Sequence, residues 1–231
     1  LFLCAALPLY AAGLDDLTYT TTGAEVTITD CDTDATGELV IPDTIEGNPV
    51  TGIGRAAFEN CASLTSITIP GSVTSIGDFA FNRCRSLTSM TIPDSVTSIG
   101  VLAFQSCSAL TNVNIPDTVT SIANGTFQYC SSLTSIAIPD SVTTIGQNAF
   151  LGCSSLTSVT IPDSVTTIVR SAFFNCSSLT SVTIGNGVTS IPVNAFRGCS
   201  SLTGVTIPNG VTSIERAAFE DCKSLTSITI P

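Results

Sequence analysis

A 23-residue period governs most of this 231-residue chain. One cysteine, one phenylalanine and one leucine return at this interval without a gap. The cysteines are Cys61, Cys84, Cys107, Cys130, Cys153, Cys176, Cys199 and Cys222, and the phenylalanines are Phe58, Phe81, Phe104, Phe127, Phe150, Phe173, Phe196 and Phe219. A fixed period of this length is typical of stacked coils that bury their apolar sides against their neighbours. We therefore expect a solenoid with one core along its length.

The unit that begins at Leu64 shows how one coil is built. Residues 64–70 (Leu-Thr-Ser-Ile-Thr-Ile-Pro) alternate apolar and hydroxyl side chains, which predicts a half-buried strand with Ile67 and Ile69 inward. Pro70 and the next residue, most often Asp in other units, predict a turn. Residues 73–76 predict a second short strand, and residues 80–84 predict a short helical or 3₁₀ turn that is too short for a full helix. About eight side chains per coil point inward, so a coil is stable only when stacked.

The regions before the regular units predict a cap and a leader. Residues 1–13 are apolar and end in small residues, which predicts the remnant of a secretory signal peptide, with an apolar cap strand as the alternative. This run is shorter than the roughly 20 apolar residues that cross a bilayer. Residues 14–38 predict a capping hairpin that turns at 20–23. Residues 39–231 predict the solenoid, with a five-residue insertion near 46–49 in a degenerate first coil and a truncated last unit.

Charge and composition exclude several function classes. The net charge is −11 with only seven Lys and Arg residues, which argues against binding to nucleic acid, because phosphates need a basic track. The chain has no His, and its carboxylates are scattered, so no acid, base and nucleophile come together for catalysis. We therefore expect a non-enzymatic protein that has no cofactor.

The cysteine row permits disulfides, a metal or packing as explanations. Equivalent atoms of adjacent coils are about 4.8 Å apart at strand spacing, but their Cβ vectors run parallel and do not converge to the roughly 3.8 Å of a disulfide. Zinc would favour paired cysteines or His, which the repeat lacks. A free cysteine packs as a small hydrophobe, so we predict packing. Whether Cys31, which lies outside the row, is paired stays open.

Two acidic patterns raise the question of calcium. Residues 30–34 (Asp-Cys-Asp-Thr-Asp) begin like a calcium loop but lack the glycine and glutamate that an EF-hand requires. Asp94, Asp117, Asp140 and Asp163 recur at the corner of the coil, where turn geometry also favours Asp. We interpret both patterns as turns and expect no metal.

The outward residues of the first strand form one candidate surface, which we call the strand face. A regular hydroxyl array could order water as an ice-binding surface does, whereas the alternative is that Ser and Thr are simply compatible with strands. Asn112, Asn114, Ala137 and Gly204 interrupt the array. The residues of the array are Ser66, Thr68, Ser89, Thr91, Ser158, Thr160, Ser181 and Thr183.

The second candidate surface is the segment between the inward isoleucine of the second strand and the next inward leucine, residues 77–86 in the first regular unit. We call it the turn arc. It carries all seven basic residues, and it varies most from coil to coil. Arginine and aromatic residues commonly anchor interfaces, although short turns also tolerate variation without function. The candidate partner-binding residues are Arg83, Arg85, Tyr129, Arg170, Phe174 and Arg197.

The unit from Leu133 to Cys153 resembles the BspA-like, Treponema-type leucine-rich repeats, and the resemblance extends over about residues 39–231. It implies a leucine-rich-repeat solenoid, a right-handed superhelix with a parallel β ladder. It also implies a secreted or surface protein. Such proteins occur in bacteria and some protozoa, and several of them look like adhesins. The family has no fixed catalytic residues to carry over.

Together these features predict a secreted or cell-surface module for protein interaction or adhesion. Its partner would be a protein or glycan ligand on a host or neighbouring cell. The alternative is a structural spacer or an ice-binding array. Curvature separates the two, because a helical turn on the arc would bend the rod, whereas a flat rod with threonines in lattice register would favour the array.

Overall fold

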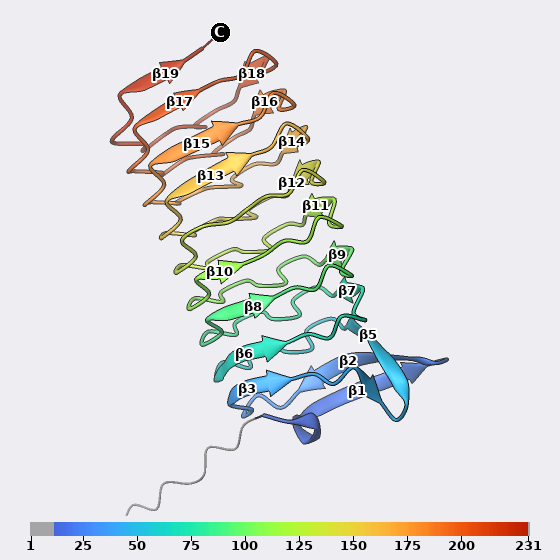
Figure 1. Cartoon of the computed structure of the whole chain (residues 1–231). Helices are drawn as coiled ribbons and strands as arrows, with labels where there is room; N and C mark the ends of the chain where they lie inside the picture. The colour runs from blue at the N-terminus through green and yellow to red at the C-terminus, as the bar shows by residue number, and fades with distance from the viewer. Residues whose placement is uncertain (1–11, 231) are drawn as a thin grey trace, which may run out of the picture.

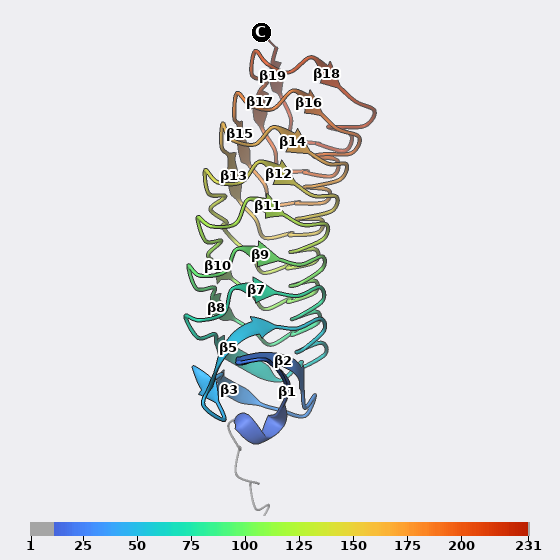
Figure 2. The same cartoon turned by 90° about the vertical axis from the view of Figure 1, so that its right-hand side faces the viewer.

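The coils stack into an elongated rod (Figure 1, Figure 2). The computed structural model describes residues 12–230. The predicted signal-peptide remnant therefore lies outside the described residues, apart from Ala12 and Gly13. Coil follows coil along the rod in sequence order, so every coil contacts the one before it and the one after it.

The amino-terminal cap is a hairpin attached to the first coil. After a 3₁₀ turn, η1 (Leu14–Asp16), strand β1 (Leu17–Thr22) pairs antiparallel with β2 (Glu25–Cys31) around Gly23, whose φ is +64°. Strand β2 then pairs in parallel with β5 (Asn48–Ile53). The cap therefore closes the core by continuing a sheet of the solenoid.

The insertion in the first coil forms a second small hairpin. Strand β3 (Gly37–Val40) begins the coil, and β4 (Thr44–Ile45) pairs antiparallel with β5. Glu46 and Gly47, with φ of 52° and 80°, make the tight turn between them. Two successive residues of positive φ suit the turn type that joins strands through two residues.

Two parallel ladders follow the regular coils. The first ladder is interrupted after β10, and the second is interrupted after β9 and again after β14. The first contains β6 (Leu64–Thr68), β8 (Ser89–Thr91), β10 (Asn112–Val113), β13 (Ser158–Ile161), β15 (Ser181–Ile184), β17 (Gly204–Thr206) and β19 (Ser227–Thr229). The second contains β7 (Ser75–Ile76), β9 (Ser98–Ile99), β11 (Ser121–Ile122), β12 (Thr144–Ile145), β14 (Thr167–Ile168), β16 (Ser190–Ile191) and β18 (Ser213–Ile214).

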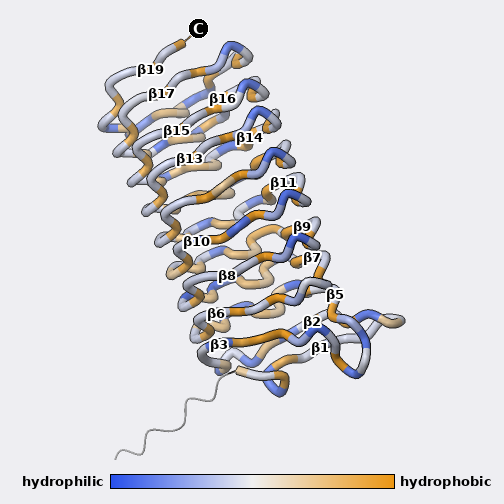
Figure 3. Tube along the Cα trace, in the orientation of Figure 1, coloured by the Kyte–Doolittle hydropathy of each residue, from blue (hydrophilic) through white to orange (hydrophobic). Residues whose placement is uncertain are grey.

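The core is a set of stacked columns of identical residues. Figure 3 shows apolar segments that recur from coil to coil along the rod. The column of phenylalanines runs from Phe58 to Phe219, with adjacent ring centroids 5.1–5.5 Å apart and interplanar angles of 4–13°. The cysteines form a neighbouring column, and all nine described cysteines are free. From Cys84 onward, each thiol of the column donates to the phenylalanine carbonyl of the preceding coil, as Cys153 does to Phe127 at 3.2 Å, whereas Cys61 donates to Cys31 O. The cysteines therefore pack in the core as predicted, and their thiols also form hydrogen bonds.

Hydroxyl side chains explain much of the Ser and Thr content. Thr157 donates to the carbonyl of Thr134 at 3.2 Å, and equivalent threonines repeat this bond from coil to coil. Ser164, after the corner of its coil, donates to the carbonyl of Val142 at 2.8 Å. These bonds occupy carbonyl groups along the sides of the rod, where few charged residues are present.

Ser164→Ala is expected to lower the free energy of unfolding by about 1 kcal/mol, because a half-buried carbonyl loses its hydroxyl partner. Ser181→Ala is the matched control. Ser181 is exposed on the strand face, and among the described residues its hydroxyl has no hydrogen-bond partner, so the change should stay within about 0.5 kcal/mol. Urea denaturation followed by circular dichroism measures both. Equal losses would show that the hydroxyl bonds contribute nothing.

The turn arc contains no helix in the regular coils that the structure describes. Its turns carry i to i+3 hydrogen bonds, such as Glu59 N–H to Ala56 O at 2.9 Å. Two residues of each coil, the second before and the second after the phenylalanine, have left-handed φ, as in Ala56 (57°) and Asn60 (66°). Such residues cannot continue a right-handed helix, because L-amino acids pay about 1–2 kcal/mol per residue in this conformation.

Backbone hydrogen bonds between coils hold the arc in this conformation. Phe58 N–H donates forward to Ala80 O at 2.7 Å, and Ala56 and Asn60 donate forward to Asp78 and Asn82 at 2.8 Å. The same three bonds recur between each pair of successive arcs up to the last one, at 2.7–3.3 Å. The arc therefore stacks by direct backbone bonds, as the strands do, and adds no extra width that would bend the rod (Figure 2).

Candidate functional site

A ridge of large side chains crosses the middle of the turn arc. Leu151, Phe174 and Arg197 occupy the same position in three consecutive coils, directly after the phenylalanine of the core. Tyr129 lies beside them, one position further along its own coil. Among the described residues between 41 and 213, Tyr129 is the only large apolar side chain that is exposed, at 49%. These four residues define what we call the arc ridge.

Glycine at position 152 makes room for the tyrosine of the arc ridge. Gly152 has a φ of 73°, and a Cβ atom there would lie 2.6 Å from Cδ1 of Tyr129. The ring therefore rests against the backbone of the next coil. Leu102 lies in the same way over Gly125, where an added Cβ would be 2.4 Å from its Cδ2 atom. Side chains at left-handed positions thus lean towards the following coil.

Arg197 is held in place at the end of the arc ridge. Its guanidinium group lies 5.9 Å from the ring centroid of Phe174, and it forms ion pairs with Glu220 at 3.1 Å and Asp221 at 3.6 Å. These exposed pairs stabilise the fold little, but they reduce the conformational freedom of the side chain. Arg197 is therefore less available as a free cation than the sequence suggests.

The other arginines among the candidates lie apart from this ridge. Arg83, Arg85 and Arg170 are exposed, and within residues 12–230 no ion pair or ring contact joins them to the ridge. Arg83 also occupies a left-handed position, with φ of 63°. Of the six candidates, the structure therefore joins Phe174 with Arg197, places Tyr129 against Gly152 of the coil that precedes Phe174, and leaves the other three separate.

The eight hydroxyl candidates of the strand face fall on two separate sheets of the first ladder. Those on β6 and β8 belong to one sheet and those on β13 and β15 to another. Residues 133–139, between the two sheets, form no strand. The rod is nearly straight, which is one condition of the ice-binding alternative, but the rows that it requires are interrupted.

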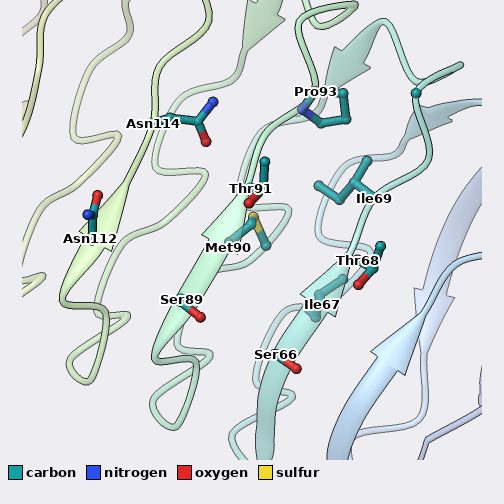
Figure 4. Close-up of a pocket in the computed structure, with 11 residues that line it drawn as sticks. Ser66, Ile67, Thr68, Ile69, Ser89, Met90, Thr91, Pro93, Asn112 and Asn114 are labelled. Carbon is teal, nitrogen blue, oxygen red and sulfur yellow. The ribbon is translucent and has the colours of Figure 1, made fainter.

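A hollow on the strand face is the feature that the sequence interpretation missed. It has a volume of about 790 Å³ and lies over β6, β8 and β10 (Figure 4). Its lining includes Asn112 and Asn114, which in sequence look like mere interruptions of the hydroxyl rows. A signal was present, because these are the only two asparagines in those rows.

The acidic patterns are used in turns. Asp30 Oδ1 accepts the N–H of Cys31 at 3.0 Å, and Asp32 Oδ1 accepts the N–H of Asp34 at 2.9 Å. At the corner of the coils, Asp163 Oδ1 accepts the N–H of Asn186 at 2.7 Å. No group of three or more His, Cys, Asp or Glu residues in the described chain is placed to hold a metal ion. Likewise, residues 12–230 include no helix with the length and apolar character to span a membrane.

Comparison with known proteins identifies the repeat. The model of the BspA type leucine rich repeat region matches residues 51–179 and 120–231, with six copies. A leucine-rich repeat protein from Bacteroides ovatus ATCC 8483 is 30% identical over 96% of this chain and 54% of its own, with a TM-score of 0.75. The T. pallidum leucine-rich repeat protein is 30% identical over 94% of this chain and 91% of its own, with a TM-score of 0.64.

The two related proteins are covered to different extents by this chain. The chain spans about half the length of the B. ovatus protein and nearly all of the T. pallidum protein. No curated protein matches the chain. The family model nevertheless covers all the regular coils, and both related structures share their stacking. The chain belongs to the BspA-type leucine-rich repeat family.

Proposed function

We propose that this protein is a non-enzymatic interaction module, displayed outside the cell, that binds a partner protein through the arc ridge. The observation that carries the proposal is the exposure of Tyr129 beside Leu151, Phe174 and Arg197 on a rod otherwise coated mostly by small polar residues. Tyrosine and arginine are enriched among residues that dominate binding energy. The extracellular location and the adhesive role follow from the resemblance to surface proteins of this repeat type.

The physical state of the ridge suits binding. Tyr129 rests on the backbone at Gly152, and Arg197 is restrained by two ion pairs, so both side chains lose little freedom when a partner docks. Preorganised side chains bind more tightly because the ordering cost is already met in the free protein. Leu151 and Phe174 are partly exposed and extend the apolar surface that Tyr129 begins, and apolar surface grouped on one face commonly marks an interaction site.

Binding to a panel of purified extracellular matrix proteins and to whole cells, at physiological salt, tests the proposal. Tyr129→Ala and Phe174→Ala should each lower the affinity by about 30-fold, since anchor residues contribute about 2 kcal/mol or more. Gly152→Ala should also weaken binding, because it displaces the ring of Tyr129 without removing it. The combined change of Arg83 and Arg85 to Ala tests the separate basic candidates.

Two controls decide the outcome. A charge-matched unrelated solenoid reports non-specific binding. The strand-face double variant Ser181→Ala, Thr183→Ala should bind as the unchanged protein does. Absence of saturable binding across the panel, or loss of binding in the strand-face variant with normal binding in the ridge variants, would overturn the proposal.

A further inference from the structure

The hollow on the strand face is formed where the repeat changes its residues. It is bounded by β6, β8 and β10, and its volume of about 790 Å³ lies within the range of about 300–1,000 Å³ typical of small-molecule sites (Figure 4). Met90, the only methionine of the chain, occupies a row that is otherwise Ile or Val. Asn112 and Asn114 occupy rows of Ser and Thr, and Gly71 stands at a corner where Asp is usual. All four departures from the repeat line the hollow.

The side chain of Asn114 interrupts the ladder of strand hydrogen bonds beside the hollow. Its Oδ1 atom accepts the N–H of Ile92 at 3.0 Å, and its Nδ2 atom donates to the carbonyl of Ile92 at 2.9 Å. At the equivalent place in another coil, the backbone carbonyl of Thr229 accepts the N–H of Ile207 at 2.9 Å. The side chain of Asn114 thus replaces a strand-to-strand bond. Strand β10 ends at Val113, and its sheet ends with it.

The lining of the hollow combines an apolar floor with uncharged polar walls. Ile67, Ile69 and Met90 are 3–6% exposed, so they contribute only a small apolar surface at the bottom of the hollow. In the part of the chain that the structure describes, the side chains of Ser66, Ser89, Thr91 and Asn112 make no hydrogen bond within the protein. Hydroxyl and amide groups can each donate and accept, so these walls can pair with either type of partner group.

The uncharged lining of the hollow favours an uncharged ligand. The chain carries a net charge of −11, yet none of the residues that line the hollow is charged. A charged ligand would lose water there without gaining an opposite charge. A pyranose ring has apolar C–H faces and a rim of hydroxyl groups that donate and accept, which matches this floor and these walls.

We propose that the hollow is a binding site for a neutral saccharide. One ring lies across β6, β8 and β10, and its hydroxyl groups bond to Ser66, Ser89 and the amide of Asn112. Asn114 is a positioning residue, because its amide holds the ladder open through Ile92. This site is separate from the arc ridge and does not depend on the proposed protein partner.

The test uses the full chain and an immobilised panel of neutral glycans, which includes glucans, mannans and β-1,4-linked N-acetylglucosamine oligomers, with heparin and polygalacturonate as charged counterparts. Isothermal titration then measures affinity for the neutral glycans that bind. The double variant Asn112→Ser, Asn114→Thr restores the repeat and should fold at least as well. It should lose affinity by about tenfold, the order expected from one or two lost hydrogen bonds.

Matched variants separate this site from others. Ser181→Ala with Thr183→Ala, on the other sheet of the same face, and Tyr129→Ala, on the arc ridge, should leave glycan affinity unchanged. Thermal denaturation of every variant confirms that the coils remain stacked. Binding of neutral glycans that survives the double variant, binding of charged glycans only, or absence of saturable binding up to millimolar concentration would each overturn the proposal.

Discussion

Phe127→Ala is expected to lower the free energy of unfolding by about 3–5 kcal/mol, the loss typical of a phenylalanine removed from a packed core. Phe127 has no exposed surface, and its ring centroid lies 5.5 Å from those of both Phe104 and Phe150. Truncation leaves a cavity in the middle of the column and removes two stacked contacts. Because each coil is stabilised only by its neighbours, we also expect the unfolding transition to broaden.

Phe219→Ala is the matched control for this prediction. Phe219 is only partly buried and stacks on a single neighbour, Phe196, at 5.5 Å. Its loss should destabilise the chain clearly less than the loss of Phe127. Urea denaturation followed by circular dichroism measures both variants. Equal losses in the free energy of unfolding would show that stacking between the coils does not stabilise the column.

Alkaline pH is expected to destabilise the protein more steeply than its few tyrosines and lysine can explain. Burial raises the pKa of the Cys153 thiol from 9.0 to about 12 and that of Cys222 to about 11. Burial also raises the pKa of Cys107, Cys130 and Cys176. The folded state therefore retains protons that the unfolded state releases.

The direction of the effect follows from this difference in proton binding. Below pH 9 the thiols are protonated in both states, and their contribution to stability is complete. As pH rises above 9, the unfolded chain ionises first, and each fully buried thiol costs about 1.4 kcal/mol of stability per pH unit until its folded pKa is reached. Cys153, with a pKa of about 12, has this effect over most of the range, and the raised pKa values of Cys107, Cys130 and Cys176 add to the loss in the same direction.

Urea denaturation at a series of pH values between about 8 and about 11 measures this slope. The double variant Cys130→Ser, Cys153→Ser is the control, because a serine hydroxyl can still donate to the phenylalanine carbonyl but does not titrate in this range. Its slope should be lower by about 1.4 kcal/mol per pH unit for the loss of Cys153, and the loss of Cys130 should lower it further. Identical slopes would show that the buried thiols do not govern alkaline stability.

The period of the sequence predicts the solenoid, the inward columns and the two extended pieces of a coil, and the structure confirms them except at residues 133–139, which form no strand. These features repeat identically, so one unit determines them all. Pattern alone does not predict the two left-handed residues of each arc, because residues as different as Ala56, Phe79 and Tyr129 occupy them. Bonds to the next coil, not local preference, determine their conformation.

The candidate sites are predicted less completely, for the same reason. The variable arc indicates where to look, but only the stacking shows that Tyr129 meets Gly152 and that Phe174 meets Arg197. The hollow depends on Asn114 bonding across to Ile92, a contact between residues 22 positions apart. A single sequence shows the departure from the repeat but not the space that it opens.

The forward hydrogen bonds of the arc give that side of the rod an electrical polarity. In each arc the three donating N–H groups point towards the carboxyl-terminal end, and the accepting carbonyl groups point the other way, so the peptide dipoles add along three continuous chains. An α-helix gains its macrodipole from the same alignment. The positive end of the arc dipole therefore points towards the carboxyl-terminal end of the rod, and the negative end points towards the amino-terminal end. Elsewhere in the coil, bonds between coils donate backward, as Thr97 N–H does to Thr74 O at 2.9 Å, so those peptide dipoles point the opposite way and the polarity belongs to the arc side of the rod.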